Sequence, residues 1–242
     1  MMLLTPEYPG GLFGEPVGSL AKESFRVFDN GVAQQVSVFE RSTQQALSVA
    51  LLMDISGSTA KDLRYEINSI GGFLRALFKE GNPEDRASLY TFNWEVTKQV
   101  PFTRRADRLM SALNRVKPEA GTALYDAVYL CARELEDREG RKVMIIVTDG
   151  GDTTSSHSFR EALEAAHRAD AVVYPILVVP IAGETGRNVA GENALQMFAN
   201  GSGGRVHSPR AVGQELDRVF AQILTDLRTQ YLLGYYPKNL PY

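Results

Sequence analysis

Two long apolar runs dominate the hydrophobic pattern of the chain, at residues 47–53 and 143–147. An uninterrupted apolar run of this length is typical of a strand that is buried on both faces of a parallel sheet. Residues 171–179 form a third run, although Pro175 inside it lacks the N–H that a central strand donates. The pattern therefore predicts three buried parallel strands, with a bulge or a sheet edge at Pro175.

Helical spacing separates these strands. Apolar residues recur three and four positions apart in several stretches, which marks one buried face of a helix in each. These positions are Leu63, Ile67, Ile70, Leu74 and Leu77, then Leu124, Ala127, Cys131 and Leu135, and finally Val212, Leu216, Val219, Ile223 and Leu227. Strands that alternate with helices in this way predict an α/β fold with a doubly wound, Rossmann-like sheet.

The order of the strands can also be predicted. Residues 87–93 and 96–102 are short strand-like runs whose close spacing makes them an antiparallel pair. We expect the strand at 47–53 to be central, between those at 87–93 and 142–148. The strand at 96–102 then lies antiparallel at an edge.

The two ends of the chain differ in composition from the middle. Residues 1–22 are rich in Gly and Pro and predict a flexible leader. In residues 23–45, alternating runs flank an Asp-Asn-Gly turn, which is a β-hairpin signal. We place the main domain at 46–228 and a strand, truncated from a longer protein, at 229–242. Because the chain ends of α/β domains often lie close together, we predict that hairpin and strand pair into a small β-appendage.

Oxygen-bearing side chains gather where the buried strands end. The candidates are Asp54, Ser56, Ser58, Thr122 and Asp149. The first three follow the first apolar run, the fourth opens a predicted helix, and the last follows the second run. Ligands of doubly wound sheets bind outside the carboxyl ends of the strands. If the two runs are neighbouring strands, both acids therefore project into one crevice.

Hydroxyl and carboxylate oxygens suit Mg²⁺, Mn²⁺ or Ca²⁺ better than soft metals. Without a cation, two close carboxylates would repel each other, and one would have a raised pKa. We therefore predict one divalent cation, Mg²⁺ first, with Ser56 and Ser58 as direct ligands. Asp54, Thr122 and Asp149 would coordinate it directly or through water.

Several residues near this edge have simpler interpretations. Ser58 could serve only as the N-cap of the following helix. Asp152 competes with Asp149, and we expect it to lie outside the ligand sphere or in solvent. For Asp126 we favour stabilisation of a helix N-terminus over metal binding. Trp94 is either an exposed contact or a core residue, and the three histidines suit surface or capping roles.

The set of candidate ligands resembles the metal-ion-dependent adhesion site of the von Willebrand factor A domain. The resemblance rests on Asp-x-Ser-x-Ser at 54–58, Gly-Thr-Ala-Leu-Tyr-Asp-Ala at 121–127 and Val-Thr-Asp-Gly at 147–150, and it covers roughly residues 46–227. The flanking segments are similar to those of a bacterial group of von Willebrand factor A-related proteins.

The resemblance implies a six-stranded, mostly parallel sheet with one antiparallel edge strand, a bound Mg²⁺ and no enzymatic activity. It also implies a protein partner, often one whose exposed Asp or Glu completes the coordination of the cation. Proteins of the bacterial group are commonly exported, so the resemblance favours a periplasmic or extracellular location over a cytoplasmic one.

Composition narrows the classes of function. The net charge of −3 provides no footprint for a polyanion, so we expect no nucleic-acid partner. No apolar run reaches membrane-spanning length. Cys131 is the only cysteine, which excludes an intramolecular disulfide, and it falls on the inner face of its helix as a buried, inert thiol.

Two other functions remain as alternatives. One is a Mg²⁺-dependent phosphoryl-transfer hydrolase with Asp54 as nucleophile. Such sites generally carry a second acid two residues further on, where this chain has Ser56, and no phosphate-binding loop or nucleophile elbow is present. The other alternative is a cytosolic scaffold subunit that works with an ATPase.

Overall fold

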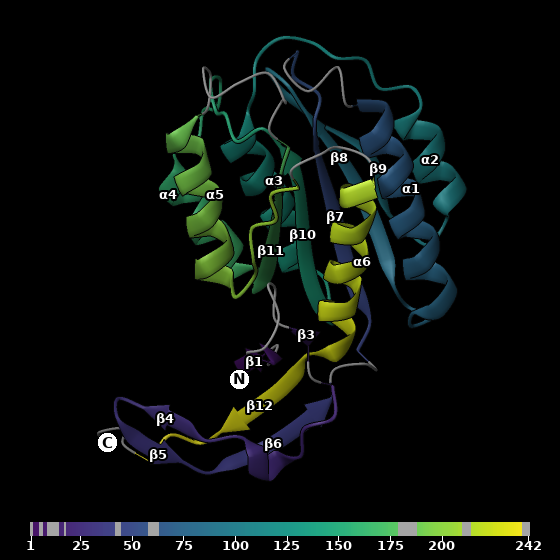
Figure 1. Ribbon diagram of the computed structural model, residues 1–242. Coiled ribbons are helices and arrows are strands. Elements are labelled where there is room, and N and C mark those ends of the chain that lie inside the picture. Colours follow the sequence, from purple (N-terminus) through teal and green to yellow (C-terminus); the bar gives the residue numbers. More distant parts are fainter. Residues whose placement is uncertain are drawn as a thin grey trace. The chain divides into compact units, whose positions relative to one another are not determined.

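The computed structural model describes residues 2–4, 7–8, 15–16, 18–41, 45–57, 63–178, 188–209 and 214–238. Contacts divide the chain into two compact units (Figure 1). The larger unit is Gln45–Ala221, and the smaller one combines Met1–Gln44 with Gln222–Tyr242. The division falls inside the last helix, whereas we expected the main domain to continue to residue 228.

The larger unit contains a five-stranded sheet with the order β11-β10-β7-β8-β9. The strands are β7 (Leu47–Asp54), β8 (Arg86–Phe92), β9 (Val96–Thr103), β10 (Arg141–Thr148) and β11 (Ala171–Leu177). The strand β7 pairs in parallel with β8 and β10, and β9 pairs antiparallel with β8 at one edge. The predicted α/β class, the central position of β7 and the antiparallel edge strand are therefore confirmed.

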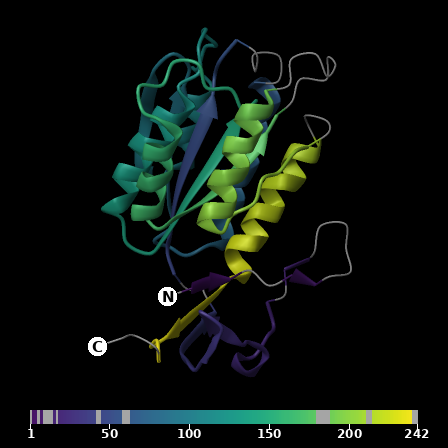
Figure 2. The same cartoon turned by 90° about the vertical axis from the view of Figure 1, so that its left-hand side faces the viewer.

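Helices lie on both sides of this sheet (Figure 2). They are α1 (Leu63–Glu80), α2 (Ala106–Leu113), α3 (Leu124–Glu136), α4 (Phe159–Arg168), α5 (Val189–Ser202) and α6 (Gln214–Thr229), which crosses the boundary between the units. A capping box formed by Ser158 and Glu161 begins α4.

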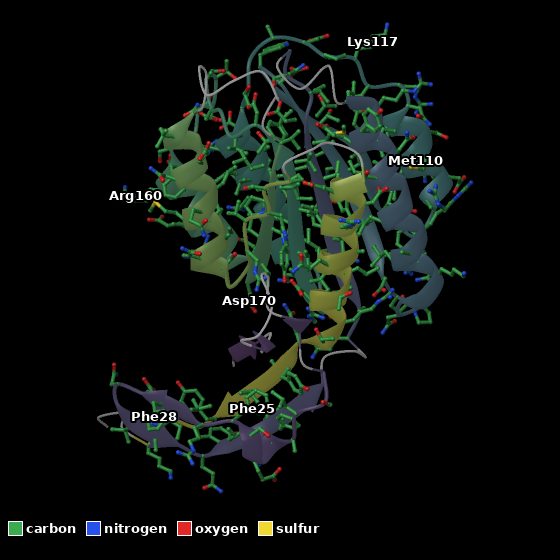
Figure 3. All side chains as sticks on the ribbon, in the orientation of Figure 1. Phe25, Phe28, Met110, Lys117, Arg160 and Asp170 are labelled. Atoms are coloured by element: carbon green, nitrogen blue, oxygen red, sulfur yellow. The ribbon has the colours of Figure 1, made fainter. Side chains whose placement is uncertain are left out.

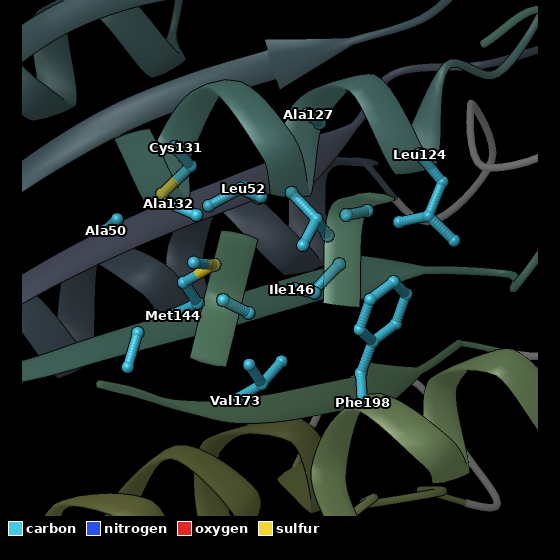
Figure 4. Packing of buried hydrophobic residues seen from close by; sticks show 14 of the residues in the cluster. Ala50, Leu52, Leu124, Ala127, Cys131, Ala132, Met144, Ile146, Val173 and Phe198 are labelled. Atoms are coloured by element: carbon cyan, nitrogen blue, oxygen red, sulfur yellow. The ribbon is translucent and has the colours of Figure 1, made fainter. Parts of the chain in front are cut away.

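One face of the sheet forms a core with α3, α4 and α5 (Figure 4). Leu52 of β7 and Ile146 of β10 contribute from the sheet, and Cys131 and Phe198 from the helices. All four side chains are buried. Burial raises the pKa of the Cys131 thiol, which makes it the inert core residue that we expected.

Pro175 lies in β11 without interrupting the parallel register. The N–H groups of Val173 and Leu177 point away from β10, because they donate to Ser202 Oγ and to the His207 carbonyl. Pro175 is midway between them, so its missing N–H falls on the same outer side. No hydrogen bond of the β10–β11 ladder is lost, as the predicted sheet edge requires.

In place of the sixth strand that the resemblance implied, an isolated bridge links Ile176 of β11 to His207. The His207 N–H donates to the Pro175 carbonyl at 2.8 Å, and the Leu177 N–H donates to the His207 carbonyl at 2.7 Å. Pro209 stands where the next N–H would continue the pairing, and it has none to donate. The named sheet of the described residues therefore has five strands, not six.

The smaller unit contains a three-stranded antiparallel sheet in the order β1-β12-β6. Its strands are β1 (Met2–Leu4), β12 (Tyr231–Tyr235) and β6 (Val36–Arg41). The predicted pairing of the C-terminal strand with the hairpin region is confirmed. The strand β1 lies within the stretch that we expected to be a flexible leader, as do β2 (Glu7–Tyr8) and β3 (Glu15–Pro16), so this expectation differs from the structure there.

A two-residue turn closes the predicted hairpin. Asn30 and Gly31 both have positive φ, at 49° and 78°, which is the type I′ geometry that suits twisted strands. The turn joins β4 (Val27–Asp29) to β5 (Val32–Gln34), whereas we expected the run at 36–39 to be the partner. That run belongs to β6 and pairs with β12 instead.

Candidate metal centre

The carboxyl ends of β7 and β10 meet at one edge of the sheet. The two strands are hydrogen-bonded neighbours over their whole length, so the condition for bringing Asp54 and Asp149 together is satisfied. In Figure 3, Lys117 lies near this edge, and Asp170, which precedes β11, lies near the opposite one. The candidate site is therefore built from the loops that leave the carboxyl end.

Asp54 is the last residue of β7, and its side chain is 0% exposed. Its Oδ1 accepts a hydrogen bond from the Ser56 N–H at 2.8 Å, and its Oδ2 accepts one from Thr148 Oγ1 at 2.7 Å. Sequence analysis did not identify Thr148 as part of the site. Its position beside Asp54 follows only from the register of β7 and β10.

Burial raises the pKa of Asp54 to about 6. The hydrogen bonds from Ser56 and Thr148 oppose this rise, whereas the nearby charge of Asp149 adds to it. Burial outweighs the two hydrogen-bond donors, because it removes the water that would otherwise solvate the carboxylate. The protonated form of Asp54 is therefore favoured more than it would be in water.

Ser56 is buried directly after Asp54, in a loop that touches the segment before α3. It forms an isolated parallel bridge with Glu119, whose N–H donates to the Ile55 carbonyl at 3.0 Å. Ser58 lies outside the described residues. Of the first candidate group, the structure therefore places Asp54 and Ser56.

Thr122 is buried one residue before the N-cap of α3. Its carbonyl accepts the N–H groups of Thr153 at 2.8 Å and Thr154 at 3.2 Å, and its own N–H donates to Thr153 Oγ1 at 3.0 Å. Thr153 and Thr154 belong to the loop that begins at Asp149. The loops carrying Thr122 and Asp149 are thus joined through their backbones.

Asp149 follows β10 and is half-buried. Its Oδ1 accepts a hydrogen bond from the Gly151 N–H at 3.3 Å. Burial is the main cause of the raised pKa of Asp54, and the charge of Asp149 adds a smaller contribution. The two acids therefore interact at one edge.

Asp152 has a role that we did not expect. Its Oδ1 accepts the N–H of Tyr125 at 3.1 Å and the hydroxyl of Ser155 at 2.6 Å. The N-cap residue of α3, Ala123, has no side-chain hydrogen bond to the helix. Asp152 therefore caps α3 from another loop, rather than lying in solvent.

Asp126 binds the far end of the same loop. Its Oδ2 accepts the Ser156 N–H at 2.9 Å, and its Oδ1 accepts the His157 N–H at 2.8 Å and contacts His157 Nδ1 at 2.7 Å. Burial by itself would raise the pKa of Asp126, but these hydrogen bonds outweigh it and hold the pKa below its ordinary value. We expected this acid to stabilise only its own helix, so its link to the loop is a further correction.

Trp94 borders this edge and is 57% exposed, so the core interpretation of this residue is wrong. Its indole Nε1 donates to Glu119 Oε2 at 3.3 Å. Gly121 packs against it with φ of +86°, and a Cβ at that glycine would lie 2.8 Å from the Trp94 Cβ. The backbone of the loop that precedes Thr122 therefore needs a glycine at this position.

The residues at this edge fit a hard divalent cation. A desolvated carboxylate lies next to a second acid, and the neighbouring hydroxyl-bearing residues supply uncharged oxygens. Within the described part of the chain, no group of three or more His, Cys, Asp or Glu residues is close enough to hold an ion.

Comparison with known proteins agrees with this architecture. Residues 49–151 match the model of the von Willebrand factor type A domain. No helix in the described ranges is both long and apolar enough to cross a membrane. No curated protein sequence matches the chain significantly.

Several solved structures share the fold. BatB from Bacteroides thetaiotaomicron is 21% identical with a TM-score of 0.58, over 75% of this chain and 98% of that one. The von Willebrand factor domain of the type V pili tip protein Mfa5 from Porphyromonas gingivalis is 12% identical with a TM-score of 0.59, over 76% and 97%. Proximal thread matrix protein 1 from the mussel byssus is 18% identical with a TM-score of 0.62, over 82% and 49%.

The family match covers β7 to the start of the Asp149 loop, which includes every candidate ligand. We conclude that the unit Gln45–Ala221 has the fold of a von Willebrand factor type A domain, as the resemblance to this family predicted.

Proposed function

We propose that this protein is a non-enzymatic binding domain that holds a divalent cation at the carboxyl edge of its sheet and captures a protein partner there. Asp54, Ser56, Ser58, Thr122 and Asp149 are the proposed ligands, directly or through water. Mg²⁺ is the preferred ion, and Mn²⁺ or Ca²⁺ can replace it. An exposed Asp or Glu of the partner completes the coordination.

The observation that carries this proposal is the adjacency of β7 and β10, which brings the buried carboxylate of Asp54 and the acid Asp149 to one edge of the sheet. Burial raises the pKa of Asp54 to about 6, although hydrogen bonds from Ser56 and Thr148 oppose the rise. A divalent cation at this edge would stabilise the ionised form, and the adjacent charge of Asp149 would be neutralised by the same ion. Because few of the proposed ligands are charged, the bound ion would retain an attraction for an outside carboxylate.

Proteins with a similar fold support a binding role. They include a tip protein of type V pili and a matrix protein of mussel byssus threads. The hydrolase alternative is disfavoured by the surroundings of Asp54. Such a site generally carries a second acid two residues after the nucleophile, where this chain has Ser56.

The test is calorimetric titration of Mg²⁺ and Mn²⁺ into chelator-treated protein, beside the variant Asp54→Asn. Asparagine can preserve both hydrogen bonds, since its oxygen accepts from Ser56 and its amide donates to Thr148 Oγ1. We expect binding by the parent and its loss in the variant. A parent that binds no cation, or a variant that binds as well as the parent, would refute the proposal.

The matched control is Asp85→Asn. Asp85 is another buried carboxylate, whose Oδ1 accepts from the N–H of Leu47 at the opposite end of β7. This variant should bind the cation like the parent, even if its stability changes. Loss of binding in both variants would show that any disturbed buried acid has this effect.

The partner carboxylate can be tested with acetate as a probe. In Mn²⁺-loaded protein, water-proton relaxation reports the waters bound to the ion. Acetate should lower this relaxation as it displaces a bound water. No change up to the concentration at which free Mn²⁺ is itself complexed would argue against an open coordination position.

A further inference from the structure

The loop from Asp149 to Ser158 and the first turn of α3 bind each other reciprocally. Two loop side chains accept hydrogen bonds from N–H groups of the helix. Asp152 Oδ1 accepts from the Tyr125 N–H, and Ser155 Oγ accepts from the Asp126 N–H at 3.1 Å. In return, the carboxylate of Asp126 accepts two loop N–H groups. Each segment therefore satisfies backbone donors of the other.

These contacts join the elements that carry two of the proposed ligands. Asp149 starts the loop, three residues before Asp152. Thr122 precedes α3, four residues before Asp126. Ser155 links the two acids, because its hydroxyl donates to Asp152 and accepts from the Asp126 N–H. Hydrogen bonds that involve a carboxylate are roughly twice as strong as neutral ones.

The far end of the loop is held by more than the carboxylate. The imidazole of His157 contacts Asp126 and stacks on the ring of Tyr129, with centroids 3.8 Å apart. Beyond it, Ser158 and Glu161 form the capping box of α4. The loop is thus bound at both ends, and Asp152 and Asp126 supply the carboxylate contacts between the loop and the first turn of α3.

We propose that Asp152 and Asp126 are positioning residues of the cation site, which clamp the Asp149 loop onto α3 and so set Asp149 and Thr122 at the separation that the cation requires. This inference rests on the proposed function. Neither residue is a ligand in it, and both act through the backbone. Groups that orient metal ligands typically change metal affinity by roughly 10–100-fold when removed.

Two substitutions at Asp152 separate a clamp from a ligand. Both of its hydrogen bonds use one oxygen, so Asp152→Asn can keep them while it removes the charge. Asp152→Ala removes both. We expect the Mg²⁺ Kd of Asp152→Asn to stay within about threefold of the parent, and that of Asp152→Ala to rise roughly 10-fold or more. If asparagine loses as much affinity as alanine, Asp152 is a ligand and the inference is overturned.

Asp126→Asn tests the other half of the clamp. Its amide nitrogen cannot accept the Ser156 N–H, so one loop contact is lost. We expect the Mg²⁺ Kd to rise roughly 10-fold. Glu161→Gln is the matched control, because it weakens a carboxylate cap at the end of the same loop without touching α3. Equal Kd values for the parent and Asp126→Asn would make the contact merely structural and overturn its positioning role.

A readout without metal completes the test. Amide hydrogen exchange of Tyr125 should accelerate in Asp152→Ala and remain slow in Asp152→Asn, since only alanine frees this N–H. Unchanged exchange in the alanine variant would contradict the clamp. If the parent binds no cation, the proposed function fails and this inference with it. If the parent binds the cation and the clamp variants bind it equally well, the proposed function stands and only this inference fails.

Discussion

Asp54 and Asp126 are carboxylates at the same edge of one sheet, but their surroundings have opposite effects. Asp54 is completely buried, and burial raises its pKa to about 6 in spite of hydrogen bonds from Ser56 and Thr148. Asp126 is partly exposed, and N–H groups of Ser156 and His157 hold its pKa below the ordinary value. Burial outweighs hydrogen bonding at the first acid, and hydrogen bonding outweighs burial at the second.

The difference explains how one edge can contain both a ligand site and a structural joint. The carboxylate of Asp126 accepts two loop N–H groups and so holds the loop. The carboxylate of Asp54 is buried with a raised pKa, so a cation that stabilised its ionised form would offset the cost of burial. The same residue type thus acts as a tether or as a proposed ligand according to its solvation.

His207 extends the comparison to a buried base. Burial lowers the pKa of this imidazole to about 4, and the charge of Arg205 contributes to the decrease. The ring stacks on Tyr174, and its Nε2 has no hydrogen-bond partner among the described residues. The folded-state pKa of His207 lies below the unfolded value. The contribution of the neutral imidazole to stability is therefore complete above pH 6.5 and is lost as the pH falls towards 4.

We expect the protonation of His207 to lower the free energy of unfolding by up to roughly 3 kcal/mol as the pH falls from 6.5 to 4. Urea unfolding of the parent and of His207→Phe, which keeps a ring against Tyr174, checks it at pH 7.5 and 4.5. The parent should lose more stability than the variant over this interval. Parallel losses would show that the imidazole is not the group responsible.

Thr148→Val would make the surroundings of Asp54 less favourable still. Valine has nearly the same shape but lacks the hydroxyl that donates to Asp54 Oδ2, so a buried acceptor loses its partner. We expect a decrease of about 1–3 kcal/mol in the free energy of unfolding. Chemical denaturation at pH 7.5 without cation measures it.

Ser88→Ala is the control for that hydroxyl. Ser88 is also buried in the sheet, but its Oγ has no hydrogen-bond partner in the described structure. Its removal should be neutral or slightly stabilising. Similar losses in both variants would mean that Thr148 contributes through packing rather than through its hydrogen bond.

Asp54→Asn should stabilise the protein in the absence of cation, by about 1–2 kcal/mol, because it removes a buried charge and can keep both hydrogen bonds. Millimolar Mg²⁺ should reverse the order, since only the parent gains free energy from the ion. Thermal melts with chelator and with Mg²⁺ measure both effects. A variant that is less stable than the parent with chelator would contradict our account of Asp54.

Asp126→Asn should have the opposite sign and the smallest effect. The variant loses charge-assisted hydrogen bonds at a partly exposed position, which we expect to lower the free energy of unfolding by about 1 kcal/mol. The same melts test it, with chelator present. An increase in stability would remove the contrast between the two carboxylates.

The sequence by itself determined the main strands, the α/β class and the central position of β7. Uninterrupted apolar runs and helical spacing report local burial, and burial is what periodicity encodes. The sequence also indicated the acids at the ends of β7 and β10, because each directly follows one of the apolar runs. Their proximity depended on one condition, the adjacency of the two strands, which the register of Val49 with Val143 satisfies.

Only the tertiary structure decided which groups partner the candidate residues. Thr148 reaches Asp54 across the strand register, and Asp152 caps a helix that begins 28 residues before it. No local pattern specifies such contacts, because a carboxylate accepts any suitably placed donor. Likewise, the pairing of β1 with β12 and the reduction of the sixth strand to His207 depend on where distant segments meet. Periodicity describes how a segment is buried, whereas folding selects the segment against which it packs.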